Sequence, residues 1–255
     1  MKPPIIVPIE ELNAQPYASI LCFPNPNEQE LESRIQELHS LGVSALEFTG
    51  EASLFGVKVP VLGKGFVCIV VIAKVDEKKA AVKILRVDSG RADLLHEAAM
   101  LQKANTVAVG PKLIGASKNF LIMQLIDGEL LPNWLEKTSD KVVVKRVLGQ
   151  ILEQCYRLDE AGIDHGELSK APKHLLVDKA LSVFMVDFET ASSERHVANV
   201  TAVCQYLFAG NSSASRILAE SLGQKDMGQL VAALKAYKKN RTRHNFEGLL
   251  AVCLS

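Results

Sequence analysis

A single lysine interrupts the apolar stretch Ala80-Ala81-Val82-Lys83-Ile84. The surrounding segment 79–87 is predicted to form a β-strand. Because side chains alternate between the two faces of a strand, Lys83 shares a face with Ala81 and Leu85 and points inward. An inward lysine needs an anion beside its ammonium group, either a carboxylate or a bound phosphate. The sequence around Lys83 therefore indicates a buried ion pair or a phosphate site.

Glu97 is the carboxylate predicted to pair with Lys83. It lies three residues after Leu94 and four before Leu101, at the edge of the apolar stripe of a predicted helix. Taken one at a time, a solvated edge lysine and a solvated glutamate explain these residues better. Taken together and in this order along the chain, they favour a pair.

Upstream of the lysine, Gly63-Lys64-Gly65 separates two predicted strands, 57–62 and 67–75. Glycines in such a turn let backbone N–H groups approach a phosphate closely. A plain hairpin turn explains the same glycines equally well. Two further strands are predicted at 112–116 and 119–126, after the helix that carries Glu97.

Two acidic segments follow in the second half of the chain. Asp164-His165-Gly166-Glu167-Leu168-Ser169 comes directly after a helix that is predicted to end at Gly162. Val183-Phe184-Met185-Val186 is an apolar strand followed by Asp187. An acid at the end of such a strand can hold Mg²⁺ on phosphate oxygens, although aspartate is also common in ordinary turns.

In this order, the glycine loop, strand lysine, helix glutamate, acidic loop and strand-end aspartate resemble the motifs of protein kinases, over about residues 57–190. The segment 165–169 looks closest to the His-Gly-Asp-Leu-Ser loop of RIO-type kinases, and no Ala-Pro-Glu segment follows Asp187. The resemblance implies an α+β, bilobal protein-kinase-like fold. Its N-lobe would have a five-stranded antiparallel sheet and one main helix, and its C-lobe would be reduced and mainly helical.

The resemblance also implies an atypical serine/threonine protein kinase that uses ATP and Mg²⁺, is capable of autophosphorylation and acts on an unidentified protein. Lys83 would grip the α- and β-phosphates, Glu97 would hold Lys83, Asp187 would bind Mg²⁺, and Glu167 would orient or deprotonate the acceptor hydroxyl. Met123 would line the adenine pocket. The full set implied to bind the nucleotide is Gly63, Lys64, Gly65, Lys83, Glu97, Met123 and Gln124.

The sequence departs from the family's pattern in the acidic loop. Glu167 stands where the family has aspartate, and a misplacement of about 1 Å can cost about 10²-fold in rate. Pro172 occupies the position of the metal-binding asparagine, and an insertion of two residues would bring His174 there instead. Imidazole is a poor ligand for Mg²⁺ and a better one for Mn²⁺ or Zn²⁺.

Two other functions compete with the protein kinase. A nucleotide-binding pseudokinase or ATP-driven switch is favoured by Glu167 and the missing asparagine, whereas the retained Lys83, Glu97 and Asp187 count against it. A small-molecule phosphotransferase of the aminoglycoside or choline kinase kind usually adds helices around its acceptor pocket. The stretch 128–162 is predicted to hold only one long helix and a short turn near Trp134, which counts against that class.

The expected domains are an N-terminal extension (1–55), the N-lobe (56–126) and the C-lobe (127–255). Within the extension, the proline-rich segment 1–26 is predicted to be an extended lead-in. A helix is predicted at about 28–41, with Asn27 as its N-cap and Gly42 as its stop.

Composition excludes several broad classes of protein. Lys plus Arg and Asp plus Glu are both 29, so the formal net charge is zero and general attraction to nucleic acid is not expected. The five cysteines form no C-x-x-C pair, which favours reduced core thiols over disulfides or zinc ligands. No apolar run approaches the roughly 20 residues that span a bilayer, and the N-terminus is a poor signal peptide. We therefore expect a cytoplasmic protein without a membrane partner.

One basic cluster lies outside these motifs. It consists of Lys235, Lys238, Lys239, Arg241, Arg243 and His244. A solvated helix face is the simpler explanation. The alternative is a docking patch for RNA or an acidic partner.

Overall fold

The computed structural model describes residues 3–255, and its backbone contacts divide the chain into two units. The first unit runs to Ala99 and includes Lys112–Leu125. The second unit consists of Met100–Pro111 and Ile126–Ser255. Residues 100–111, which were expected in the N-lobe, are therefore grouped with the second unit.

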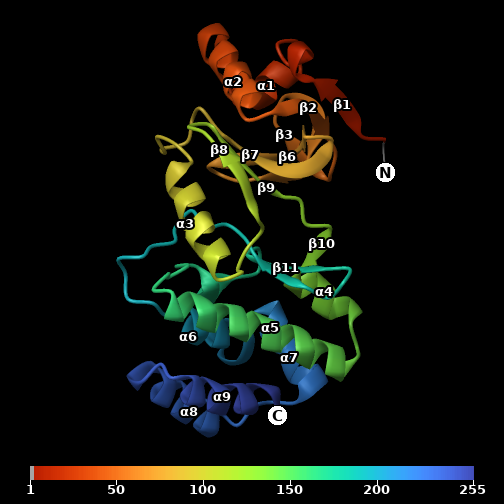
Figure 1. The fold of residues 1–255 in the computed structure, drawn as a ribbon. Coiled ribbons are helices and arrows are strands. Elements are labelled where there is room, and N and C mark those ends of the chain that lie inside the picture. The colour runs from red at the N-terminus through yellow and green to blue at the C-terminus, as the bar shows by residue number, and fades with distance from the viewer. Residues whose placement is uncertain (1–2) are drawn as a thin grey trace. The chain divides into compact units, whose positions relative to one another are not determined.

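An antiparallel sheet forms the centre of the first unit (Figure 1). Its strands lie in the order β1-β2-β6-β7-β9-β8, and the short β5 pairs with β6. The strands are β1 (Ile5–Pro8), β2 (Val43–Phe48), β5 (Gly63–Lys64), β6 (Cys68–Val75), β7 (Lys78–Leu85), β8 (Leu113–Ala116) and β9 (Phe120–Gln124). A separate antiparallel pair consists of β3 (Ala52–Leu54) and β4 (Val57–Val61).

The sequence prediction of a five-stranded sheet is therefore wrong, because this sheet has seven strands within residues 3–255. Four predicted strands are present as β6, β7, β8 and β9. The remaining one, predicted at 57–62, is β4, and it pairs with β3 outside the main sheet. Strand pairing depends on contacts far along the chain, so a local β pattern cannot tell to which sheet a strand belongs.

The described part of segment 1–55, which the sequence predicted to be an N-terminal extension, contributes strands and core side chains to the first unit. β1 and β2 extend the main sheet beyond β6, and the 3₁₀ turn η1 (Ile9–Glu11) and helix α1 (Tyr17–Leu21) supply fully buried side chains to its core. The proline-rich composition of residues 1–26 suggested an extended lead-in. Pro8 is compatible with a strand here because it ends an edge strand.

Helix α2 (Glu28–Ser40) confirms the predicted helix and its cap. The Asn27 side chain accepts hydrogen bonds from the N–H groups of Gln29 and Glu30, at 3.0 and 3.2 Å. The Glu30 carboxylate does not complete a capping box but binds Arg34, with 2.7 Å between Oε1 and Nε. Figure 1 shows α1 and α2 lying together beside β1 and β2.

Arg34 ties α2 to the sheet from a site that is 2% exposed. Its Nη1 donates to the carbonyl oxygens of Leu21 and Leu85, each at 2.6 Å, and its Nη2 donates to Asn119 Oδ1 at 3.1 Å. Because the guanidinium has its donors satisfied and Glu30 beside it, the buried charge is compensated.

Alternation along β7 separates the two faces of the sheet. Val82 and Ile84 are fully buried in the main core, together with α1 and α2. Leu85 packs on the other face, in a smaller cluster with Leu94 and Ala98 at the start of helix α3 (Leu95–Thr106). Lys83 shares this second face, as alternation predicts.

The second unit contains a small antiparallel sheet surrounded by helices. Its strands are β10 (Gly128–Leu130), β11 (Leu175–Asp178) and β12 (Val183–Met185). Its helices are α4 (Leu131–Lys137), α5 (Lys141–Glu160), α6 (Asn199–Cys204), α7 (Ser213–Leu222), α8 (Met227–Lys239) and α9 (Arg243–Leu254), with a 3₁₀ turn η2 (Leu168–Lys170) and a π turn η3 (Gln205–Ala209). The hairpin β11–β12 and the end of α5 before Gly162 confirm two sequence predictions.

Helix α5 organises the packing of this unit. Val147, Leu148, Ile151 and Leu152 are fully buried along one stripe, as the helical spacing predicts. α8 and α9 lie side by side, and α9 packs against α5 (Figure 1).

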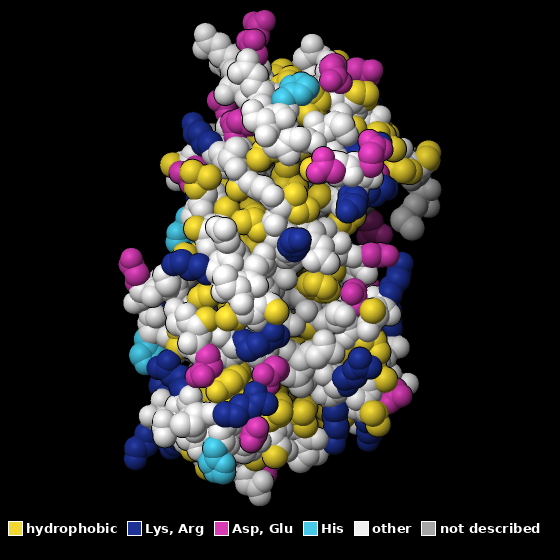
Figure 2. Space-filling view, viewed as in Figure 1, with side chains coloured by type: hydrophobic (Ala, Val, Ile, Leu, Met, Phe, Trp, Pro, Cys, Tyr) yellow, Lys and Arg dark blue, Asp and Glu magenta, His cyan; other side chains and the backbone are white. Residues whose placement is uncertain are grey.

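Composition and surface agree with the sequence analysis. All five cysteines are buried and free. Basic and acidic side chains are interspersed on the face shown in Figure 2. Among the described residues, no helix is both long and apolar enough to cross a membrane.

Replacing Arg34 with alanine should lower the free energy of unfolding by about 3 kcal/mol, because Glu30 and two buried carbonyl oxygens lose their partner. The measurement is urea unfolding of each variant. Glu32→Ala, an exposed position on the same helix, is the control and should change stability by less than about 0.5 kcal/mol. Equal stability of both variants would contradict the anchoring role of Arg34.

Candidate functional site

The first unit contains a buried ion pair. Lys83 Nζ lies 2.6 Å from Glu97 Oε1, and the two residues are 9% and 3% exposed. Lys83 is held on both sides, because β7 pairs with β6 at Val70 and with β9 at Leu121. A buried pair is weak support for stability, since the loss of hydration costs each ion several kcal/mol. Such a pair on a central strand is therefore a candidate for function.

The start of α3 fixes the position of Glu97. Asp93 Oδ1 accepts a hydrogen bond of 2.9 Å from the Leu95 N–H, which satisfies a donor of the first helical turn. Glu97 follows within that turn, where a carboxylate is stabilised by the helix dipole. Glu97 therefore comes from a position that also favours its negative charge.

The glycine segment forms a tight turn between β5 and β6. Gly65 N–H donates to Cys68 O at 2.8 Å, and Arg86 Nη1 donates to Gly65 O at 2.9 Å. Neither Gly63 nor Gly65 has a positive φ, and a Cβ at Gly63 would make only ordinary contacts at 3.7 Å. The turn itself therefore does not require glycine at residue 63, which leaves close approach of a ligand as a reason for it.

The other sequence candidates of this unit lie on neighbouring strands or beside an aromatic ring. Met123 is buried on β9, opposite Ala81 of β7, and Gln124 follows it with an exposed side chain. Lys64 Nζ lies 5.7 Å from the centre of the Phe23 ring, a cation–π distance.

The second unit brings Glu167, His174 and Asp187 together. One ligand atom of each lies within 4.8 Å of those of the other two. His174 Nε2 is 3.4 Å from Glu167 Oε2, and His174 Nδ1 is 3.7 Å from Asp187 Oδ2. The imidazole thus lies between two carboxylates that are 20 residues apart in sequence.

The hairpin β11–β12 creates this arrangement. Leu175 pairs with Met185, and Val186 N–H donates to His174 O at 3.0 Å. His174 therefore lies beside Val186, directly before Asp187. The sequence places His174 and Asp187 at the outer ends of two short strands, and the antiparallel register brings those ends together.

Asp187 has a φ of +72°, in the left-handed region. A non-glycine residue there costs about 1–3 kcal/mol and persists only where the surrounding structure enforces it. Phe188, which is 1% exposed, anchors the segment directly after it. Four other non-glycine residues among those described also have a positive φ, namely Asp76, Glu77, Ala108 and Leu181. This backbone angle therefore supports a functional role for Asp187 only together with the neighbouring Glu167 and His174.

His165 packs against the group formed by Glu167, His174 and Asp187. It is fully buried, its Nε2 lies 3.1 Å from Val186 O, and its ring packs edge-on against His174. Burial, reinforced by the nearby His174, lowers the pKa of His165 to about 4. A neutral imidazole donating from Nε2 to Val186 O therefore links the acidic loop to the end of β12.

A buried network, which the sequence analysis missed, holds the acidic loop. Asp159 Oδ1 accepts from the backbone N–H and the Nδ2 of Asn199, and its Oδ2 accepts from the Tyr237 hydroxyl at 2.9 Å. Asn199 Oδ1 in turn accepts from His165 N–H at 2.8 Å. Burial raises the pKa of Asp159, and the hydrogen bonds oppose this rise. Partners 40 and 78 residues from Asp159 leave no local pattern in the sequence.

Arg195 holds the same loop from its other end. Its Nε donates to Asp164 Oδ2 at 3.0 Å, and its Nη2 donates to Thr190 O at 2.6 Å. Gly166 has a φ of +89°, and a Cβ there would lie 2.5 Å from Arg195 Nη2. Residue 166 must therefore be glycine for two reasons. Its φ is positive, and a side chain there would collide with the Arg195 guanidinium.

The residues of the basic cluster 235–244 differ in whether they have a partner in the structure. Arg243 is bound to Glu153 and Glu247, at 2.8 and 2.9 Å, and lies over the Tyr156 ring. Arg241 Nη2 lies 2.7 Å from His196 Nε2. Arg243 is thus occupied in packing, whereas Lys235 and Lys238 are exposed and have no ion-pair partner within residues 3–255.

The donor set of the second unit fits a divalent cation. Two carboxylates and one imidazole nitrogen are available, and His174 Nδ1 is buried without a hydrogen bond inside the described part of the chain. Carboxylate oxygens suit Mg²⁺ and Mn²⁺, while an imidazole ligand shifts the preference toward Mn²⁺.

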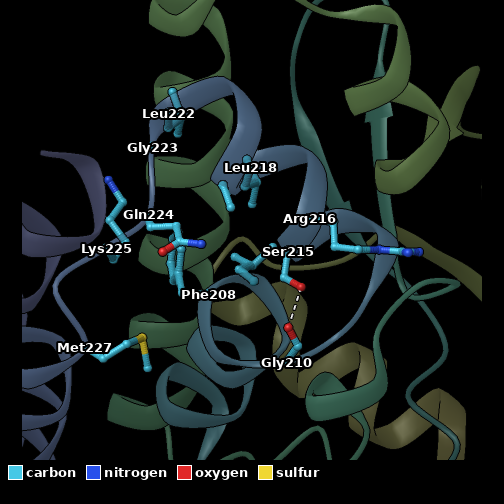
Figure 3. A pocket seen from close by; sticks show the side chains of 12 residues that line it. Phe208, Gly210, Ser215, Arg216, Leu218, Leu222, Gly223, Gln224, Lys225 and Met227 are labelled. Atoms are coloured by element: carbon cyan, nitrogen blue, oxygen red, sulfur yellow. Dashed lines mark hydrogen bonds between the residues drawn. The ribbon is translucent and has the colours of Figure 1, made fainter.

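A cavity of about 330 Å³ elsewhere in the second unit lacks such chemistry. It lies along α7 and the segment that leads to α8, and leucines and Phe208 form much of its wall (Figure 3). Ser215 Oγ is occupied by Gly210 O at 2.6 Å. Because no acid or histidine lines it, this cavity is not a candidate for proton transfer or metal binding.

Gly166→Ala should destabilise the protein more than Gly162→Ala, by about 1–2 kcal/mol, because only the first substitution displaces Arg195 from Asp164. Gly162 is the control because it also has a positive φ, +70°, but no atom lies within 4 Å of its Cβ position. Gly162→Ala therefore measures the cost of the backbone angle alone. The measurement is urea unfolding of both variants. Equal losses would show that Arg195 adjusts freely.

The burial of His165 predicts a pH dependence of stability. Its folded pKa lies near 4 and its unfolded pKa near 6.5, so the stabilisation is present above pH 6.5 and is lost as the pH falls toward 4. The loss should reach about 3 kcal/mol. Denaturant unfolding with a chelator, between pH 7 and 4, measures it. His165→Phe should flatten this part of the profile, whereas the exposed control His39→Asn should retain it.

Comparisons with known proteins identify no family for this chain. No family model matches it. An uncharacterized protein of Methanocaldococcus jannaschii is 29% identical over 119 residues, which cover 46% of this chain and 99% of that protein. The crystal structure of a kinase domain is similar with a TM-score of 0.44 and 18% identity, over 52% of this chain. This chain spans half of that kinase-domain chain.

Proposed function

We propose that this protein transfers a phosphoryl group from ATP to a hydroxyl acceptor, as a protein kinase of the RIO-like kind does. The observation that carries the proposal is the buried Lys83–Glu97 pair, with 2.6 Å between Nζ and Oε1. Because burying the two charges costs several kcal/mol of hydration free energy, the pair contributes little to stability and is better explained by a functional role. A lysine held by a carboxylate at the face of a rigid sheet is suited to grip phosphate oxygens.

The first unit would bind the nucleotide. Lys83 would contact the α- and β-phosphates, because its positively charged ammonium group is positioned by Glu97 at the face of the sheet and attracts phosphate oxygens. The turn at Gly63–Gly65 would cover the phosphates, since nothing in its own geometry calls for glycine at residue 63. Met123 would line the adenine pocket.

The second unit would supply the metal ion and the base. Asp187 would hold Mg²⁺ or Mn²⁺, and the ion would neutralise charge on the transferred phosphoryl group. Glu167 would orient the acceptor hydroxyl or take its proton, since its carboxylate lies within 4.8 Å of a carboxylate oxygen of Asp187. His174 as a ligand would make Mn²⁺ the more effective ion.

We further propose that the acceptor is a serine or threonine of a protein, the prediction made from the loop at residues 165–169. A nucleotide-binding switch without phosphoryl transfer is the second candidate. The position of His174 favours it, because the imidazole lies 3.4 Å from Glu167 and would compete with the acceptor hydroxyl for that carboxylate. The two candidates differ in turnover and share nucleotide binding.

An assay with labelled ATP tests the proposal. The wild-type protein should label itself or a protein acceptor with Mg²⁺ and faster with Mn²⁺. Lys83→Met and Asp187→Ala should each lower the rate by about 10²-fold or more, because each removes a group that stabilises the transferring phosphoryl. Label in protein, in small acceptors and in free phosphate is counted separately.

Matched controls are Lys79→Met and Asp127→Ala. Lys79 lies on the same strand as Lys83 but pairs with Glu47 at 57% side-chain exposure, and Asp127 pairs with Lys179 at the surface. Both controls should retain the wild-type rate. Tight nucleotide binding without any transfer would favour the switch, and label in small acceptors alone would favour a small-molecule phosphotransferase. Absence of nucleotide binding would refute all of these functions.

A further inference from the structure

A cavity of about 470 Å³ borders the acidic loop within the second unit. Gly166, Leu168 and Ser169 form one wall, so the cavity lies along the backbone on both sides of Glu167. The opposite walls come from α6, η3 and α8, and their polar side chains include Thr201, Gln205 and Lys238. Its volume is within the range of natural ligand sites, about 300–1,000 Å³.

The charge of this cavity is positive. Its acidic residue, Asp164, is occupied, because Arg195 binds its Oδ2 at 3.0 Å and the Ala198 N–H donates to its Oδ1 at 3.3 Å. Lys238 is exposed at the opposite wall and has no ion-pair partner in the described part of the chain. Lys238 therefore leaves one uncompensated cation facing the cavity.

A second cation, Arg241, contacts His196 of the cavity wall. His196 lines the cavity, and Arg241 donates to its Nε2 at 2.7 Å, which leaves Nδ1 to donate to Val197 O at 3.1 Å. Arg241 has no carboxylate partner within residues 3–255. The histidine thus binds an arginine that lies outside the cavity lining, without neutralising its charge.

The positive charge continues along α8. Lys235 precedes Lys238 by three residues, so the two side chains lie on one face of the helix, about 5–6 Å apart. Lys235 is exposed and lies beyond the residues that line the cavity. A ligand that contacts both lysines must therefore be longer than the cavity itself.

We propose that this cavity and the exposed face of α8 bind an acidic polypeptide segment and present its serine or threonine to Glu167. This inference rests on the proposed function, because it names the acceptor of the same reaction. Carboxylates of an extended chain on one side of the phospho-acceptor would meet Lys238 and then Lys235, since an extended chain rises about 3.3 Å per residue and the two lysines are about one helical turn apart.

The chemistry of the cavity favours a polypeptide over RNA. No Phe, Tyr or Trp lines it, so unpaired bases would have only the His196 imidazole on which to stack. The formal net charge of zero also argues against general attraction to a phosphate backbone. A small anionic acceptor would fill the cavity but would not reach Lys235.

Binding is tested first, without catalysis. Fluorescence anisotropy compares a short labelled peptide, a serine flanked by Asp and Glu, with the same peptide carrying Asn and Gln. The acidic peptide should bind more tightly, and salt should weaken the difference. Lys238→Glu should weaken acidic-peptide binding roughly three- to tenfold. Lys141→Glu, at an exposed position at the start of α5 and outside the cavity, is the control and should change binding at most about twofold.

The same peptides then serve as acceptors with ATP and Mn²⁺. Preferential phosphorylation of the acidic peptide, reduced by Lys238→Glu and not by Lys141→Glu, supports the inference. Equal use of both peptides, tighter binding of single-stranded RNA, or competition by a small phosphorylated alcohol that does not depend on Lys238 would overturn it. Acidic-peptide binding that depends on Lys238, without phosphoryl transfer to any acceptor, would refute the proposed function and leave the docking site standing. Melting temperatures verify that each variant is folded.

Discussion

A charge that is buried must be compensated, and the first unit is arranged around two such charges. Arg34 fastens α2 to the sheet by satisfying backbone carbonyls, whereas Lys83 is paired with Glu97 on the opposite face. The first arrangement uses its donors for structure. The second places an ammonium group beside the Glu97 carboxylate, on the face of the sheet that also carries Leu85.

The same constraint shapes the second unit. Asp159 and Asp164 are buried carboxylates whose oxygens are filled by backbone and side-chain donors from distant segments. These contacts fix the loop that carries Glu167, so the strained backbone at Asp187 and the compressed turn at Gly166 can persist. Rigid support of this kind lets a few polar groups act without reorganisation when charge develops.

Much of the local structure could be predicted from the sequence because its signals are periodic or depend on single residues. The apolar stripe of α5, the Asn27 cap and the inward face of Lys83 all follow from spacing and side-chain chemistry. The strands β1 and β2 could not be predicted in the same way. β1 lies in a proline-rich stretch that resembles a loop, and it joins the sheet by pairing with β2, which in turn pairs with β6.

The sequence by itself determined which residues carry chemistry: a lysine in an apolar strand, a glutamate on a helix stripe, and acids after a glycine and after a strand. Only the tertiary structure decided their neighbours. It placed His174 between Glu167 and Asp187, bound Arg243 to Glu153 and left Lys238 beside the acidic loop. The reason is physical, because periodicity reports which face a side chain takes, whereas the register of distant segments sets what it meets there.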